Sequence, residues 1–233
     1  MRTSEKLVAA SFLTVAACLL LAPREAAAQE TTIQRNSAWG TVSDVGLILG
    51  TSSVFLMPRV YYSDPEATVG WKGRWHVSVL APALTMVAAS VLVEVPIKDA
   101  IESPRPDCGV DETVASVSGS GCETFASPST HAFASWGATG TGLGIFLVDT
   151  FRYSSGKFNV GGFIGNVAFP LTASVFTSIG RAVDVPGDEQ PFENFGQTMA
   201  GAVPGFILGL GVGAAYAALQ RPTCGYGNAI ICW

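Results

Sequence analysis

Five apolar stretches alternate with polar segments along the 233-residue chain, following a shorter apolar run at the N-terminus. Each holds about 16–21 residues, close to the roughly 20 that a helix needs to cross a bilayer. Their many Gly, Ala, Ser and Thr residues favour closely packed helices in a membrane. The pattern therefore predicts an all-α chain, a polytopic bundle of five to six apolar helices, near residues 42–57, 77–93, 131–148, 161–179 and 199–219.

A soluble bundle of core helices is the alternative, because two stretches are short and Asp44 lies within the first. Hydrophobic residues make up 48% of the chain, charged residues only 13%, and the mean hydropathy is +0.38. This composition excludes intrinsic disorder, which requires low hydrophobicity. The net charge of −5 argues against nucleic acid as a partner, since such proteins present a basic surface.

The N-terminal residues have the features of an export signal. Arg2 and Lys6 precede an apolar run from Leu7 to Leu21, and the small residues at 26–28 suit cleavage before Gln29. We therefore expect three parts, a signal peptide, a helical domain and a short tail, at residues 1–28, 29–220 and 221–233. Two alternatives stay open, an uncleaved first transmembrane helix and a lipid attached at Cys18.

Charge is distributed unevenly between alternate loops. If the chain starts inside and crosses at every apolar stretch, the inside segments hold eight of the 13 bases and four acids. The outside segments hold five bases and 13 acids. Basic loops prefer the cytoplasm, so this asymmetry favours a protein of the bacterial inner membrane whose outside loops face the periplasm. A soluble periplasmic protein is the alternative location.

Cysteine usage fits an exported chain. Cleavage of the signal would leave four cysteines, an even number that suggests disulfides. Cys108 and Cys122 share one polar loop and form the expected pair, whereas Cys224 and Cys232 fit either a disulfide or reduced thiols.

Three outside segments carry groups suited to binding an anion. Lys98 and Arg105 lie in KDAIESPRP, the pattern K-x(6)-R-P; the sequence PSTH opens the next apolar stretch with Ser129, Thr130 and His131; and Arg181 ends the fifth. A phosphate dianion needs fixed positive donors, and guanidinium groups bind its oxygens two at a time. A helix N-terminus adds backbone N–H groups, and histidine transfers protons near neutral pH.

This order of motifs resembles the signature of the type 2 phosphatidic acid phosphatase and vanadium haloperoxidase superfamily: K-x(6)-R-P, then P-S-G-H, then S-R-x(5)-H-x(3)-D. The resemblance spans residues 98 to about 201 and implies that family's helical bundle. It also implies that Lys98, Arg105, Ser129, Thr130 and Arg181 bind the phosphoryl group, with His131 as a catalytic acid. No metal or other cofactor is expected.

The chain departs from the signature at two positions. Thr130 stands where the family has glycine. Threonine keeps the backbone N–H group, so anion binding at this position stays possible. The third motif lacks its nucleophilic histidine, because the chain holds only His76 and His131. Counting five residues beyond Arg181 reaches Gly187. An alignment on the start of the last apolar stretch instead places Glu193 at the histidine position and Gln197 at the aspartate position.

Two functions follow from these features as expectations. The first is an enzyme, a phosphoric monoester hydrolase that binds and hydrolyses a lipid phosphate or diphosphate at the periplasmic face. The second is a catalytically inactive relative that binds phosphate without turnover. A soluble periplasmic acid phosphatase of the same fold and a cation site in the acidic segment from Asp184 to Glu193 are further alternatives. The sequence indicates neither the head group nor the oligomeric state.

Overall fold

The computed structural model describes residues 34–56, 77–106, 108, 124–184 and 189–219. This part of the chain is helical, which confirms the predicted class. Its five long helical segments match the five apolar stretches to within eight residues at each end. They are α2 (Ser37–Leu56); α3 (Val77–Leu92), continued by η1 (Val93–Ile97) and α4 (Lys98–Ile101); α6 (Thr130–Val148) with η2 (Asp149–Tyr153); α7 (Val160–Phe163), η3 (Ile164–Ala168) and α8 (Phe169–Ala182); and α9 (Phe195–Leu219).

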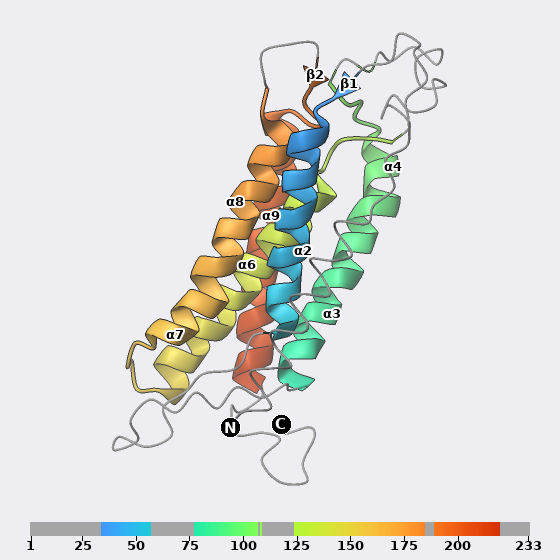
Figure 1. Ribbon diagram of the computed structural model, residues 1–233. Coiled ribbons are helices and arrows are strands. Elements are labelled where there is room, and N and C mark those ends of the chain that lie inside the picture. The colour runs from blue at the N-terminus through green and yellow to red at the C-terminus, as the bar shows by residue number, and fades with distance from the viewer. Residues whose placement is uncertain (1–33, 57–76, 107, 109–123, 185–188, 220–233) are drawn as a thin grey trace. The chain divides into compact units, whose positions relative to one another are not determined.

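Helix α6 lies at the centre of these segments and contacts α2, α3, α8 and α9 (Figure 1). Most of its residues are buried, and many are small: Gly, Ala, Ser and Thr. Two short strands, β1 (Gln34–Arg35) and β2 (Glu189–Gln190), pair in parallel at one end of the bundle. The same end holds α4 and the first turns of α2 and α9 (Figure 1).

Glycines bring α9 against the backbone of α6. They recur every four residues, so they lie on one face of the helix. A Cβ atom placed on any of them would lie 2.0–2.3 Å from a carbonyl oxygen of α6 or of its N-cap Ser129, far inside van der Waals contact; these glycines are Gly201, Gly205, Gly209 and Gly213. Small residues at fixed spacing are how membrane helices approach closely, and this contact fixes the start of α6 beside the start of α9.

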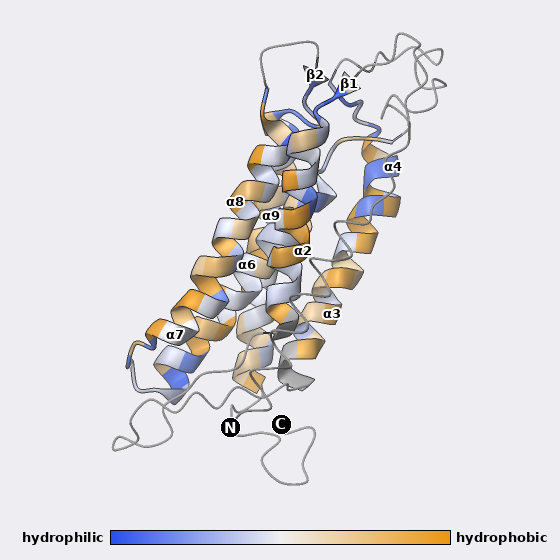
Figure 2. Cartoon of the chain, in the orientation of Figure 1, coloured by the Kyte–Doolittle hydropathy of each residue, from blue (hydrophilic) through white to orange (hydrophobic). Residues whose placement is uncertain are grey.

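Within the described residues, three helices are long and apolar enough to cross a membrane: Leu80–Ile101, Val160–Ala182 and Phe195–Leu219. Large apolar side chains on them face outward, such as Leu84 (61% exposed) and Ile207 (63% exposed), and Figure 2 shows apolar residues along α3 and α8. These helices indicate a membrane protein. α2 and α6 are not among the three.

Several sequence predictions concern residues outside the described ranges. The signal peptide at 1–28, the tail at 221–233 and His76 belong to this group. Cys108 is disulfide-bonded, and its predicted partner Cys122 also lies outside the described ranges.

Candidate functional site

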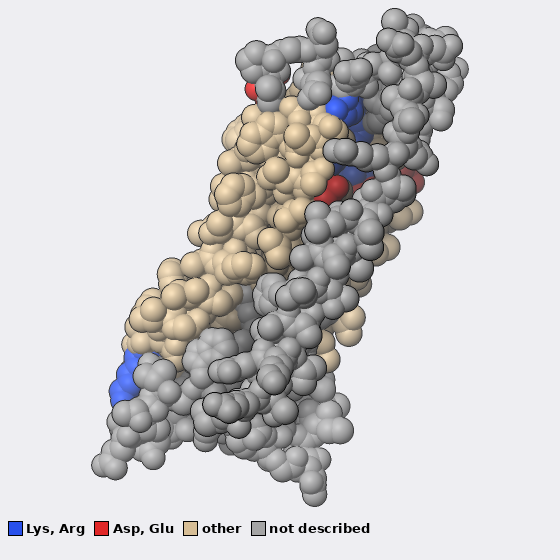
Figure 3. Space-filling model, viewed as in Figure 1, with Lys and Arg blue, Asp and Glu red and all other residues tan. Residues whose placement is uncertain are grey.

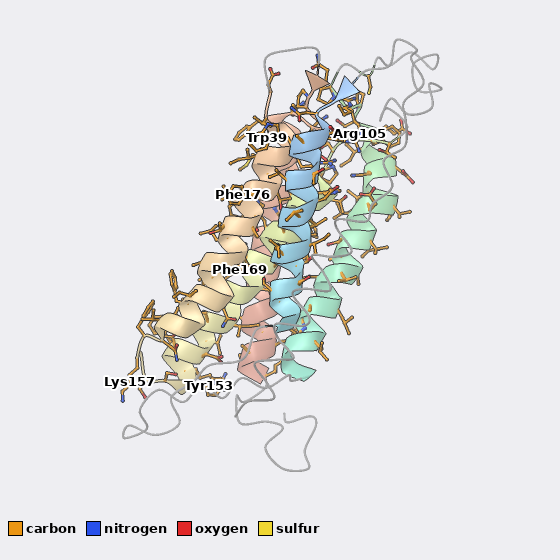
Figure 4. The ribbon with its side chains drawn as sticks, in the orientation of Figure 1. Trp39, Arg105, Tyr153, Lys157, Phe169 and Phe176 are labelled. Atoms are coloured by element: carbon orange, nitrogen blue, oxygen red, sulfur yellow. The ribbon has the colours of Figure 1, made fainter. Side chains whose placement is uncertain are left out.

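The three motif segments meet at the end of the bundle that carries β1 and β2. Lys98 begins α4, Ser129 precedes the first residue of α6, and Arg181 lies in the last turn of α8. Arg105 follows α4, and Figure 4 shows it at this end, far from Lys157 at the other.

A turn after α4 brings the first motif to the second. Glu102 ends the helix in the left-handed conformation, with φ at 50°, and its N–H group donates to the carbonyl of Lys98. The chain then runs beside the segment before α6, where Ala126 N donates to Ser103 O at 2.9 Å. Lys98 and Arg105 are therefore held next to the start of α6.

Gln197, in the first turns of α9, joins the segment after α4 to the segment before α6. Its Nε2 donates to Pro104 O at 2.8 Å and to Ser103 Oγ at 3.2 Å. Its backbone carbonyl accepts from Ser129 N at 3.1 Å. The residue that aligns with the family's aspartate therefore has a structural role, tying three loops together.

Lys98 is buried beneath a carboxylate. Only 4% of the residue is exposed, and its Nζ lies 2.8 Å from Glu94 Oε2, one helical turn earlier. The hydroxyl of Thr130 donates to the same carboxylate oxygen. Glu94 lies in η1, a wide turn that contains Pro96, which has no N–H group for the regular helical ladder. Glu94 thus links the first two motifs.

Arg105 reaches across to the loop before α9. Its Nη1 donates to Phe192 O at 3.1 Å, while Nε and Nη2 donate to Thr124. Burial is the main cause that lowers the pKa of Arg105, and the positive charges of Arg181 and Arg35 lower it further. The nearby carboxylates of Glu193 and Glu94 oppose this shift. The guanidinium nevertheless stays charged at any physiological pH.

Arg181 forms a buried ion pair with Glu193. Its Nη2 and Nε lie 2.9 Å and 3.2 Å from Glu193 Oε1, and the residues are 5% and 0% exposed. The ring of Phe192 covers the guanidinium, with the Arg181 Cζ 4.7 Å from the ring centroid. The second oxygen, Glu193 Oε2, is buried without a hydrogen-bond partner among the described residues.

Ser129 and His131 have different surroundings at the start of α6. Ser129 is fully buried and caps the helix, since its Oγ accepts from Ala132 N at 3.2 Å. His131 is partly exposed, and its Nε2 lies 3.1 Å from Oδ1 of Asp44 on α2. The contact of Ser129 that the structure shows is therefore its cap on α6.

Three of the predicted groups thus have their own carboxylate: Lys98 with Glu94, Arg181 with Glu193, and His131 with Asp44. In Figure 3 basic and acidic atoms lie beside each other near this end of the bundle. The charges of Glu94, Glu193, Arg35 and Arg181 act on Arg105, and those of Lys98 and His131 act on Glu94, so these groups form one electrostatic cluster.

An apolar groove begins beside this cluster. It encloses about 420 Å³ between α2, α3 and α6, and its polar members are Thr51, Ser90, Glu94, Thr130 and His131. The remaining wall residues are apolar, among them Leu47, Met86 and Val91. Along α3 and the start of η1 the wall extends from Ala83 to Glu94, about 16 Å of helix at 1.5 Å per residue.

One of the two sequence alignments concerns described residues. Glu193, which that alignment places at the histidine position, lies against the Arg181 guanidinium; Gly187, the residue of the other alignment, lies outside the described ranges. Within those ranges no group of three or more His, Cys, Asp or Glu side chains is placed to hold a metal ion. Comparison with known proteins found no matching family model, no matching curated protein and no matching solved structure.

Two carboxylates of the cluster were not identified from the sequence as site residues. Glu94 stands four residues before Lys98, the spacing of an ion pair on a helix. Asp44 shares a helix face with Leu47, Thr51 and Val54, which line the groove. Both signals were present in the sequence, yet neither indicates which partner the carboxylate meets.

Proposed function

We propose that this protein is a membrane phosphate-binding protein of the type 2 phosphatidic acid phosphatase and haloperoxidase kind. Its ligand is a lipid phosphate or diphosphate, bound at the start of α6 by Lys98, Thr130, Arg105 and Arg181. The observation that carries this proposal is the meeting of bases from three distant segments at one helix N-terminus. By the charge distribution of the loops, this end faces the periplasm of a bacterial inner membrane.

The chemistry of these groups suits a tetrahedral anion. Guanidinium and ammonium groups donate charge-assisted hydrogen bonds to phosphate oxygens, and the helix dipole of α6 favours negative charge at its first turn. Glu193 already offers a carboxylate to Arg181. A bound phosphate oxygen would take the same guanidinium contacts, so the ligand exchanges with an internal acid.

The groove supports a lipid over a free phosphate ion. Its apolar wall runs along α3, within a helix able to span a membrane, and its polar end carries Thr130 and His131. An acyl or prenyl chain placed there would lose contact with water, at a gain of about 0.8 kcal/mol per buried methylene group.

Replacing Arg105 by alanine tests the binding function. We expect the affinity for inorganic phosphate or orthovanadate to fall by about ten- to a hundredfold, because a charge-assisted hydrogen bond contributes about 1.5–3 kcal/mol and 1.4 kcal/mol is tenfold in affinity. Titration calorimetry on the purified protein in detergent measures this change.

Arg152→Ala is the matched control. Arg152 lies in η2, beyond the opposite end of α6, so its loss should leave phosphate affinity unchanged. Equal affinities in both variants would refute the site. A lipid phosphate in mixed micelles should bind more tightly than inorganic phosphate, and equal binding would refute the role of the groove.

Hydrolysis is a second candidate function, favoured by the partly exposed His131 with its carboxylate partner. The chain lacks the nucleophilic histidine of the family that it resembles. Glu193, at the aligned position, instead forms an ion pair with Arg181. Binding without turnover is the alternative that these two features favour. The two candidates differ in one measurable property, release of inorganic phosphate.

If the protein is an enzyme, His131→Ala should lower phosphate release by about 10²- to 10⁴-fold, the usual contribution of a general acid or base. Phosphatidate, undecaprenyl diphosphate and an aryl phosphate are suitable substrates for a colorimetric assay. Orthovanadate affinity serves as the control and should change little. No release by the wild-type protein from any of the three would contradict hydrolysis and leave binding as the function.

A further inference from the structure

His131 is the only histidine within the described ranges, and it contacts a carboxylate from a different helix. The Nε2 of its ring lies 3.1 Å from Asp44 Oδ1. The side chains are 31% and 59% exposed. Exposed ion pairs typically contribute about 0–1 kcal/mol to stability, so this contact adds little to the stability of the fold. Its consequence lies in the orientation of the ring.

The contact decides which ring nitrogen is available. An ionised carboxylate only accepts hydrogen bonds, so Nε2 must carry the proton that it donates to Asp44. In the neutral ring the other nitrogen, Nδ1, then holds a free lone pair. Carboxylates fix histidine tautomers in this way at many catalytic sites.

The packing of α2 against α8 holds Asp44 in place. A Cβ atom on Gly46 would lie 2.8 Å from Ala173 O, and one on Gly180 would lie 2.5 Å from Trp39 O. Gly46 therefore faces α8 at close range. At 100° per residue, Asp44 points to the opposite side of α2, where α6 presents His131.

We propose that Asp44 is a positioning residue that fixes His131 for proton transfer through Nδ1. This inference rests on the second candidate function, hydrolysis at the proposed phosphate site. A water oxygen attacks phosphorus and forms the new P–O bond, while the bond to the leaving ester oxygen breaks with its electron pair. That oxygen takes the Nδ1 proton of the imidazolium, the attacking water passes a proton to solvent, and the ring returns to the Nε2–H form bound to Asp44.

Nitrogen NMR of the full-length protein labelled with ¹⁵N-histidine tests the positioning directly. His76→Gln removes the other histidine and assigns the signals. At a pH high enough for the ring to be neutral, wild-type His131 should be mainly the Nε2–H tautomer. Asp44→Ala should give a mixture of tautomers, whereas Asp44→Asn should keep the Nε2–H form, because an amide oxygen still accepts that hydrogen bond.

Phosphate release separates orientation from charge. Asp44→Ala should lower it at least tenfold, because the ring is no longer held by a hydrogen bond at Nε2, whereas Asp44→Asn keeps that hydrogen bond and should retain more of the release. Asp99→Asn, on the exposed face of α4, carries the same charge change and should match the wild type.

An unchanged tautomer in Asp44→Ala, or wild-type release in both Asp44 variants, overturns the proposal. Its failure is distinguishable from failure of the binding site. Orthovanadate binding that depends on Arg105 would persist if only the role of Asp44 were wrong. Absent release by the wild-type protein overturns the proton-transfer step while the tautomer measurement still decides whether Asp44 orients the ring.

Discussion

Replacing Arg181 by methionine should destabilise the protein by about 3–5 kcal/mol, the usual cost of removing one partner from a buried ion pair. Methionine fills similar volume, so the loss comes from charge. The carboxylate of Glu193 is fully buried and one of its oxygens already lacks a partner among the described residues. Without the guanidinium the carboxylate would have to take up a proton or draw in water. Thermal or denaturant unfolding in detergent measures the change.

The double variant Arg181→Met, Glu193→Met should recover most of that stability, because replacing both members of a buried pair by apolar residues is often neutral or stabilising. Arg152→Met is the control, an exposed arginine whose loss should cost less than about 0.5 kcal/mol. If Arg181→Met cost no more than this control, the pair would contribute nothing and Glu193 would not compete for the guanidinium.

Replacing Gly209 by alanine should destabilise the bundle by on the order of 2–3 kcal/mol, as overpacking of a close contact typically does. The added Cβ would lie 2.1 Å from the carbonyl oxygen of Gly137 on α6. A backbone oxygen has no rotamer by which to move aside, so α9 must shift away from α6. Because Ser129 and Gln197 join these two helices at the site, phosphate affinity should fall as well.

Gly211, two residues further along α9, is the matched control. A Cβ atom there would have no neighbour within 4 Å among the described residues. Gly211→Ala should therefore be neutral or stabilising by up to about 1 kcal/mol, the helix propensity difference between these residues. Equal melting temperatures for the two alanine variants would show that the close approach of α6 and α9 is wrong.

The helices were predictable because their apolar stretches are long and bounded by polar loops. The arrangement was not, since the contact of α6 with α9 depends on which glycines face a neighbouring backbone. Gly209 and Gly211 look alike in the sequence, yet only Gly209 meets a carbonyl. A hydrophobic pattern gives the length of a helix and carries little information about its neighbours in a chain so rich in small residues.

At the site, the bases were identified, whereas of their three acids only Glu193 was named from the sequence. Lys98 and Arg181 stood out because they fall at the expected places in the ordered three-part signature. Asp44 was visible only as a charge inside an apolar stretch. Its pairing with His131 depends on the rotation of α2 about its axis, which is set by the contacts of Gly46 with α8. Sequence spacing along one helix does not determine that rotation.

The internal pairing of charges has a consequence for how a ligand arrives. While the His131 ring is neutral, four bases and three acids leave one net positive charge in the cluster of Lys98, Arg35, Arg105, Arg181, Asp44, Glu94 and Glu193. So small an excess exerts little long-range steering on anions in solution, and added salt would change the encounter rate only slightly. Capture by lateral diffusion within the bilayer leaflet, followed by a local exchange of partners, needs no such field.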